Sequence, residues 1–138
     1  KKCDQDLCDL LTNNVSLKDK LTICIDVCNG TKYLHLCRFP TVSKTANILI
    51  NYTDKIYTAK IADFGLSKEM INGRHRTGTV VGTPAYQPTI KNVSENFDES
   101  NDNWKIFDIY AFGMVMWCVF SNQPNPPTSI QKLYNTLD

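Results

Sequence analysis

Six cysteines and two histidines are the residues of this 138-residue chain with the widest capacity for metal or covalent chemistry. No two cysteines have the Cys-x-x-Cys spacing of a zinc site, and Cys24 and Cys28 lie four apart, as on one helix face. Neither His35 nor His75 has neighbours typical of a metal site or a nucleophile. We therefore interpret the thiols as reduced, buried apolar groups. The cysteines are Cys3, Cys8, Cys24, Cys28, Cys37 and Cys118.

An extracellular, disulfide-linked glycoprotein is the alternative interpretation of these cysteines. Four Asn-x-Ser/Thr triplets favour it, at Asn14, Asn29, Asn51 and Asn92. The chain is rich in Asn, Ser and Thr, however, so such triplets arise readily by chance. It opens on Lys-Lys-Cys-Asp, without a Met or the apolar stretch of a signal peptide, which we read as a fragment or a processed product.

The composition fits one globular domain with a hydrophobic core, since 42% of the residues are hydrophobic. Lys and Arg number 15 against 14 Asp and Glu, so no basic surplus indicates a nucleic-acid partner. The most apolar run, Ile106 to Phe120, contains Asp108 and is shorter than the roughly 18 residues of a membrane span. We expect it to form a helix that is enclosed by a larger protein body.

The elements that must position any site alternate between helices and a small hairpin. Ser16 and Asp19 have capping-box spacing and predict the start of a helix that continues to His35. Arg38 to Pro40 ends that helix. The remaining expected elements, in chain order, are a short helix over Lys2–Leu11, a strand at Ile48–Ile50, a turn over Asn51–Lys55, a strand over Ile56–Ile61, a loop over Leu66–Pro88, a surface loop over Asn92–Asn103, the apolar helix and a further helix over Ile130–Leu137.

Five motifs follow one another in an order that resembles the large lobe of a protein kinase. They are Tyr33–His35, Lys44–Ile50, Ala59–Lys68, Gly82–Tyr86 and Asp108–Val115. Their wording is closest to the tyrosine-kinase-like group, whose members are mostly Ser/Thr-directed. The resemblance implies a truncated C-terminal lobe, mainly α with a small β-hairpin. Residues 1–138 would then be a partial domain from the hinge-side helix to the central helix, without the small lobe and the last helices.

The resemblance also implies roles for three residues. Asp63, in Asp-Phe-Gly, matches the carboxylate that binds Mg²⁺ at the phosphates, and Asn47 matches the ligand of the second Mg²⁺. Hard cations prefer such oxygen ligands. Lys44 matches the lysine near the transferred phosphate. Mg-ATP is thus the implied cofactor, bound weakly or not at all because the small lobe that covers the nucleotide is missing.

The catalytic loop departs from the family at the residue that matters most for chemistry. Counting back from Asn47 without a gap, Val42 lies where the catalytic Asp belongs. A gapped reading is open as well, in which Pro40–Val42 matches the residues before His-Arg-Asp and that triplet is deleted. In both readings the general base is absent, and a general base is typically worth roughly 10²–10⁴ in rate.

The expected function is therefore that of a protein-kinase-like (pseudokinase) fragment with a binding or regulatory role. The alternative is a segment of an active ATP-dependent Ser/Thr kinase, truncated or mis-assembled at this point. We expect a protein partner or substrate, no nucleic acid, no membrane span and a cytoplasmic location. Asp108 matches a family Asp that binds backbone N–H groups of the catalytic loop, so we predict a structural role for it.

Overall fold

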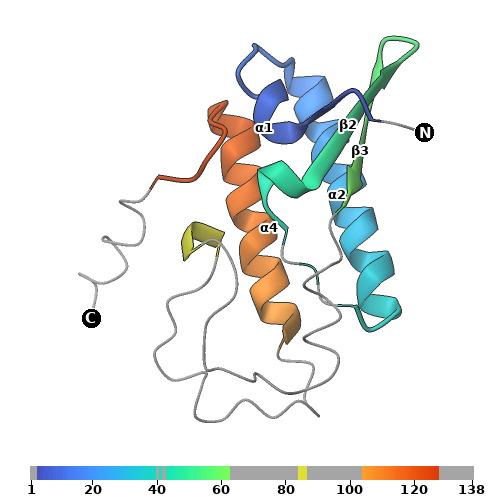
Figure 1. The fold of residues 1–138 in the computed structure, drawn as a ribbon, viewed down its shortest axis with the longest axis vertical. Helices are drawn as coiled ribbons and strands as arrows, with labels where there is room; N and C mark the ends of the chain where they lie inside the picture. The colour runs from blue at the N-terminus through green and yellow to red at the C-terminus, as the bar shows by residue number, and fades with distance from the viewer. Residues whose placement is uncertain (1–2, 40, 42, 63–83, 87–103, 128–138) are drawn as a thin grey trace.

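Two long helices packed side by side, with a small sheet against the first, make up the core of the computed structural model (Figure 1). The structure describes residues 3–39, 41, 43–62, 84–86 and 104–127. Its elements, in chain order, are β1 (Gln5–Asp6), α1 (Leu7–Leu10), α2 (Leu17–Leu36), the 3₁₀ turn η1 (Thr45–Asn47), β2 (Ile48–Thr53), β3 (Ile56–Ile61), the 3₁₀ turn η2 (Pro84–Tyr86) and α4 (Trp104–Ser121). This is the mainly α fold with a small β component that the sequence predicts.

Helix α2 begins at the predicted cap. The Ser16 hydroxyl oxygen accepts a hydrogen bond from the Asp19 backbone N–H at 3.2 Å, and its proton is donated to the Asp19 carboxylate at 2.6 Å. The serine therefore satisfies one of the N–H groups that a helix start leaves without a partner. At the other end Arg38 adopts a φ of 59°, a left-handed conformation that stops the helix next to the predicted break.

The predicted hairpin is present, but its turn is shorter than expected. β2 and β3 pair antiparallel from Ile48 opposite Ile61 to Thr53 opposite Ile56. Only Asp54 and Lys55 remain for the turn, with φ values of 53° and 63°. Positive φ at both central residues is typical of the two-residue turn that matches the twist of a hairpin. Residues 51–53, which we expected in the turn, therefore extend β2.

A third strand was missed in the sequence. Gln5 and Asp6 form β1 and pair with Ile50 and Leu49 of β2, in the order β1-β2-β3. The helix expected over Lys2–Leu11 is accordingly reduced to α1, which the Asp6 carboxylate caps by accepting the Asp9 N–H at 2.8 Å. A two-residue strand is too short to show alternation, so no periodicity could predict it.

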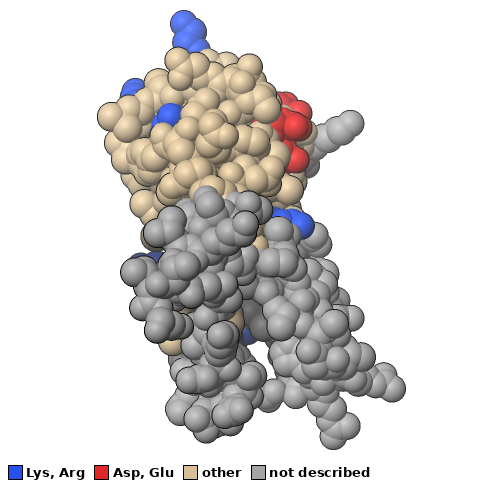
Figure 2. All heavy atoms as spheres, turned by 90° about the vertical axis from the view of Figure 1, so that its left-hand side faces the viewer, with Lys and Arg blue, Asp and Glu red and all other residues tan. Residues whose placement is uncertain are grey.

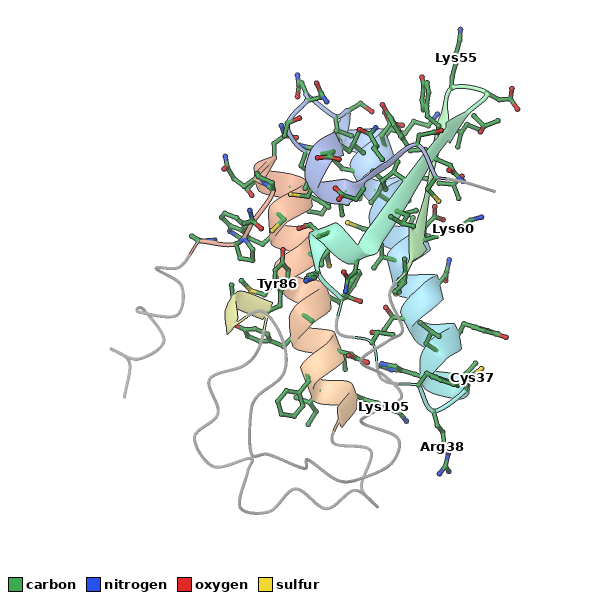
Figure 3. All side chains as sticks on the ribbon, viewed as in Figure 1. Cys37, Arg38, Lys55, Lys60, Tyr86 and Lys105 are labelled. Atoms are coloured by element: carbon green, nitrogen blue, oxygen red, sulfur yellow. The ribbon has the colours of Figure 1, made fainter. Side chains whose placement is uncertain are left out.

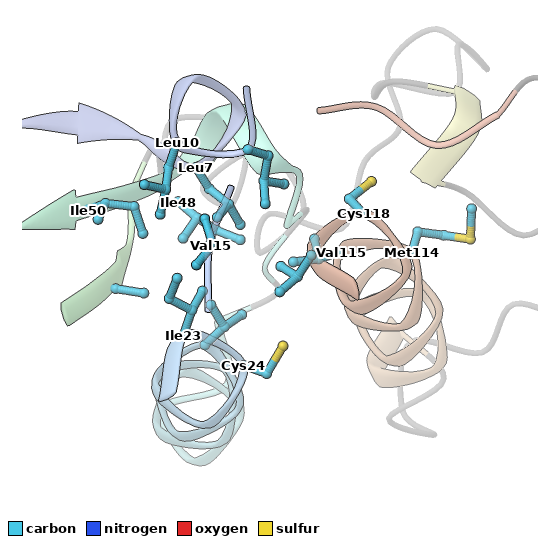
Figure 4. Packing of buried hydrophobic residues seen from close by; sticks show 14 of the residues in the cluster. Leu7, Leu10, Val15, Ile23, Cys24, Ile48, Ile50, Met114, Val115 and Cys118 are labelled. Atoms are coloured by element: carbon cyan, nitrogen blue, oxygen red, sulfur yellow. The ribbon is translucent and has the colours of Figure 1, made fainter. Parts of the chain in front are cut away.

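The core lies between α2, β2 and α4 (Figure 4). Ile23 and Val27 of α2 belong to the same buried cluster as Ile48 and Ile50 of β2, and α4 contributes Val115. All five side chains are fully buried. Continuous burial of this kind is what holds a small sheet on a helix, since two or three strands are not stable alone.

The interpretation of all six thiols as buried is wrong for part of the set. Cys24 and Cys118 are buried, and burial raises the pKa of both thiols. Cys28 and Cys37 are exposed on α2 and at its end, while the remaining two are half-buried. All six cysteines are free in the structure. The spacing of Cys24 and Cys28 gave their helix correctly but not their separate environments.

Helix α4 starts at Trp104, two residues before the expected start, and ends at Ser121. No helix among the described residues is long and apolar enough to span a bilayer. The described atoms on the face seen in Figure 2 are mostly uncharged, with few Lys, Arg, Asp or Glu side chains. The predicted loop over Leu66–Pro88 is described only at η2, and the predictions for Asn92–Asn103 and Ile130–Leu137 lie outside the described residues.

The core predicts a sharp contrast between two isoleucines of α2. Ile23 is 0% exposed and Ile25 is 59% exposed. Ile23→Ala should lower the free energy of unfolding by about 2–5 kcal/mol, because it leaves a cavity in the core. Ile25→Ala is the matched control and should change it by less than about 0.5 kcal/mol. Denaturant unfolding measures both, and equal losses would contradict the packing described.

Candidate functional site

The loop before β2 and the end of β3 meet at one backbone hydrogen bond. The Ala62 N–H donates to the Asn47 carbonyl oxygen at 2.7 Å, and the Asn47 N–H donates to the Lys44 carbonyl at 2.8 Å. Ala62 is the residue directly before Asp63. The hairpin register thus brings Lys44, Asn47 and the approach to Asp63 together at one end of the sheet.

The two remaining predicted residues, Asp63 and Val42, lie outside the described residues. Lys44 is half-exposed with an extended backbone at the start of η1, and Asn47 is half-buried at its end. An amide oxygen and a carboxylate are the kind of donor that Mg²⁺ takes, so Asn47 and Asp63 fit that ion in type. Among the described residues there is no group of three or more His, Cys, Asp or Glu that could hold a metal.

The buried carboxylate of Asp108, on α4, binds the backbone of the loop between α2 and β2. Asp108, which is 3% exposed, projects from α4 and accepts the Thr41 backbone N–H at 2.7 Å. The same carboxylate oxygen lies 2.8 Å from His35 Nε2, near the end of α2. The predicted structural role of Asp108 is confirmed. Its partner His35 was placed in the right helix by sequence, but nothing in the sequence indicated the pairing across 73 positions.

Burial and hydrogen bonding oppose each other at Asp108. Burial is the larger effect and raises the pKa of its carboxyl group, while the Thr41 N–H and His35 act to lower it. A buried carboxyl group must have partners in either protonation state. Here it has two, from two different elements, so Asp108 ties α4 to both the loop and α2.

A second anchor, which sequence reasoning missed, lies under η1. Thr45 is 1% exposed, and its hydroxyl donates to the Pro124 carbonyl at 2.7 Å. Because that hydroxyl has a single proton, the Tyr86 hydroxyl, 3.0 Å away, must be the donor to Thr45 Oγ1. Tyr86 lies beside α4 (Figure 3), with its oxygen 3.9 Å from Cys118 Sγ. Burial raises the pKa of Tyr86 to about 12, so the hydroxyl keeps its proton for this bond.

The 3₁₀ turn η2, within the predicted loop over Leu66–Pro88, is therefore fixed to η1. Tyr86 belongs to η2, yet its hydroxyl contacts a residue 41 positions earlier. A buried Tyr usually has a polar partner for its hydroxyl, which was the one available signal for this contact. The identity of that partner depends on how η2 and η1 pack on α4.

Removal of the Asp108 carboxyl group should loosen the loop. Asp108→Ala leaves the buried Thr41 N–H without an acceptor, which should cost about 1–3 kcal/mol of unfolding free energy. Cleavage by a protease within residues 39–47 should accelerate in parallel. Asp108→Asn keeps an acceptor oxygen and is the matched control, with a smaller loss. Unchanged protease resistance in Asp108→Ala would contradict the anchoring role.

The wild type and Asp108→Asn should also differ in how their stability depends on pH. The pKa of Asp108 is raised above its ordinary value of 3.8, so the contribution of this group to stability is full below about pH 3.8. It is lost as the pH rises through the folded-state pKa. Asn cannot ionise, so Asp108→Asn should gain stability relative to the wild type over this rise. If the wild type instead became more stable than Asp108→Asn by a growing margin as the pH rose, the raised pKa of Asp108 would be contradicted.

Comparison with known proteins places the chain in a family. A sequence model of the protein kinase domain matches residues 2–137. A probable leucine-rich-repeat receptor-like serine/threonine-protein kinase of Arabidopsis thaliana is 35% identical over 118 residues, which cover 81% of this chain. A second, a probable leucine-rich repeat receptor-like protein kinase of the same plant, is 37% identical over 116 residues, or 80% of this chain.

A third relative is the calcium/calmodulin-regulated receptor-like kinase 2 of Arabidopsis thaliana, 36% identical over 103 residues and 72% of this chain. The aligned regions span only 12% of the first two relatives and 21% of the third. The match gives no support to the Cys-rich glycoprotein alternative. The ordered motifs, the hairpin that joins Asn47 to Ala62 and the match over residues 2–137 lead to one conclusion: this chain belongs to the protein kinase family and is part of a kinase domain.

Proposed function

We propose that this chain is a pseudokinase-like part of a kinase large lobe, running from the hinge-side helix to the central helix, that binds or regulates a protein partner without transferring phosphate. The observation that carries the proposal is Val42 at the base position. Valine cannot accept a proton or orient a substrate hydroxyl group. Under the gapped reading the base is deleted, with the same consequence.

The support for a retained binding role comes from the hydrogen bonds that position the loop between α2 and β2. These bonds are present although the sequence lacks the base. Asp108 still holds Thr41, and Tyr86 still holds Thr45. These bonds position the loop without taking part in chemistry. Each of these buried polar groups needs hydrogen-bond partners. If the loop had no role left, nothing would require the chain to keep both groups.

Protein kinases use Mg-ATP, and we propose that this chain binds it weakly or not at all. Lys44, Asn47 and Asp63 are the residues that would hold it, the last two through Mg²⁺. When bound, Mg-ATP supplies the phosphoryl group and the cation that neutralises its charge. The proposed cytoplasmic location rests on the same reading, since ATP-dependent regulation and reduced thiols belong to that compartment.

An active kinase is the second candidate, and one observation favours it. The flanks of the loop, Tyr33–His35 and Lys44–Ile50, keep the family pattern while Phe39–Val42 departs from it abruptly. A local error or a skipped segment in an otherwise active kinase gives such a pattern. The nucleotide sequence of the parent gene across Pro40–Ser43 separates the two, because a His-Arg-Asp codon triplet there would contradict the pseudokinase proposal.

Weak nucleotide binding predicts a small thermal shift. At 5 mM Mg-ATP, a Kd of about 1 mM or weaker adds about 1 kcal/mol or less, which corresponds to a rise in Tm of less than about 5 °C. Asp63→Ala and Asn47→Ala should remove whatever shift occurs. A rise above about 10 °C that both variants abolish would show a strong metal-nucleotide site and contradict this part of the proposal.

Repair of the base predicts a gain of activity. In a chain joined to a kinase small lobe, Val42→Asp, or insertion of the His-Arg-Asp triplet for the gapped reading, should raise phosphotransfer by about 10²–10⁴-fold. Asn47→Ala in the repaired chain is the control and should reverse the gain. Comparable phosphotransfer by the unrepaired chain would overturn the pseudokinase proposal, and no gain from either repair would overturn Val42 as the lesion.

A further inference from the structure

Three buried side chains form one series of hydrogen bonds that begins at α4 and ends just beyond it. The Thr45 hydroxyl gives its single proton to the Pro124 carbonyl, so the Tyr86 hydroxyl donates to Thr45 Oγ1 at 3.0 Å. The Tyr86 proton is then in use, which leaves the Cys118 thiol, 3.9 Å away, as the donor to the Tyr86 oxygen. Thr45, Tyr86 and Cys118 are 1%, 2% and 0% exposed. Each hydrogen bond in the series therefore has a single possible direction.

The Tyr86 hydroxyl oxygen contacts Thr45 at two points. Besides its bond to the Thr45 side chain, it lies 3.5 Å from the Thr45 backbone nitrogen, whose N–H donates to it. Two contacts from one oxygen fix the orientation of Thr45 as well as its position. Tyr86 belongs to η2, which reaches this place beside α4 from 41 positions further along the chain (Figure 3).

The turn η1 transmits the position of Thr45 to Asn47. It has only three residues, with Thr45 first and Asn47 last. Two backbone hydrogen bonds close it, from the Asn47 N–H to the Lys44 carbonyl at 2.8 Å and from the Ile48 N–H to the Thr45 carbonyl. A 3₁₀ turn closed in this way is tight, because each bond spans only three residues. A shift of Thr45 therefore moves Asn47 as well.

We infer that Tyr86 is a positioning residue for Asn47 and that it acts through Thr45. This role rests on the proposed function, in which Asn47 would hold Mg²⁺, and it adds that the Tyr86 hydroxyl sets where the Asn47 amide lies. Tyr86 itself contacts Thr45 and Cys118 rather than Asn47. Loss of the Thr45 hydroxyl should therefore have the same effect on Asn47 as loss of the Tyr86 hydroxyl.

Amide hydrogen exchange, measured by NMR on this chain without nucleotide, tests the role. Tyr86→Phe keeps the ring and removes one hydroxyl, so exchange at the Asn47 and Ala62 amides should accelerate about fivefold, the effect of one net hydrogen bond. The side-chain amide signals of Asn47 should shift as well, and the signals of the folded protein do not depend on its stability. The Tyr52 amide, bound to Asp4 instead, should exchange at its wild-type rate.

Two variants of Thr45 and one control complete this test. Thr45→Val should shift the Asn47 signals as Tyr86→Phe does, and the double variant should add little, because both changes break the same bond. Thr45→Ser keeps a hydroxyl and should restore the wild-type signals. Tyr57→Phe is the matched control, since it removes a tyrosine hydroxyl from β3 and leaves the bond to Thr45 intact. Unchanged Asn47 signals in Tyr86→Phe, or fully additive effects, would overturn the inference.

The repaired chain joined to a small lobe gives a functional readout. With Val42→Asp in place, Tyr86→Phe should raise the Mg²⁺ concentration at half-maximal rate about fivefold and leave KM for the protein substrate unchanged. A mere loss of folded protein would lower the rate without moving that Mg²⁺ midpoint. An unmoved midpoint would overturn the positioning role and leave the proposed function standing. An inactive repaired parent would instead contradict Val42 as the lesion, and the Asn47 signals would then decide the positioning role alone.

Discussion

The buried carboxyl group of Asp108 is the interaction on which the rest of this structure depends. It projects from an otherwise apolar helix into a site that is 3% exposed, where an unpartnered carboxyl group would be costly. Its two partners, His35 and the Thr41 N–H, come from the end of α2 and from the loop that follows. One side chain therefore fixes the distance between the two long helices and the path of the chain between α2 and the hairpin. The hydrophobic core alone would leave both less closely defined, because apolar contacts are not directional.

The hydroxyl groups of Thr45 and Tyr86 do the same for the other side of the loop. Their bond connects η1 to η2, and Thr45 continues it to the Pro124 carbonyl after the end of α4. Thr41, Thr45 and Asn47 are thus each held by hydrogen bonds to other elements, Asn47 through its bond with Ala62. These anchors are independent of the identity of residue 42. The hydrogen bonds of Thr41 and Asn47 use backbone groups and need no catalytic side chain, so the proposed loss of the base is compatible with them.

The sequence by itself determined the long helices, the hairpin and the family. Helical spacing after Ser16, the apolar run before Phe120 and five ordered motifs are local signals, and each depends on residues close together in the chain. Four other features could not be predicted in this way. They are the strand β1, the exposure of Cys28 and Cys37, the Tyr86–Thr45 bond and the partner of Asp108. The sequence indicated that a buried Asp needs a hydrogen bond, and the kinase resemblance implied the loop as its partner. Only the tertiary structure decided that His35, 73 residues away, supplies the second one. The physical reason is that a need for a partner belongs to a single residue, whereas the partner is set by how α2 and α4 pack.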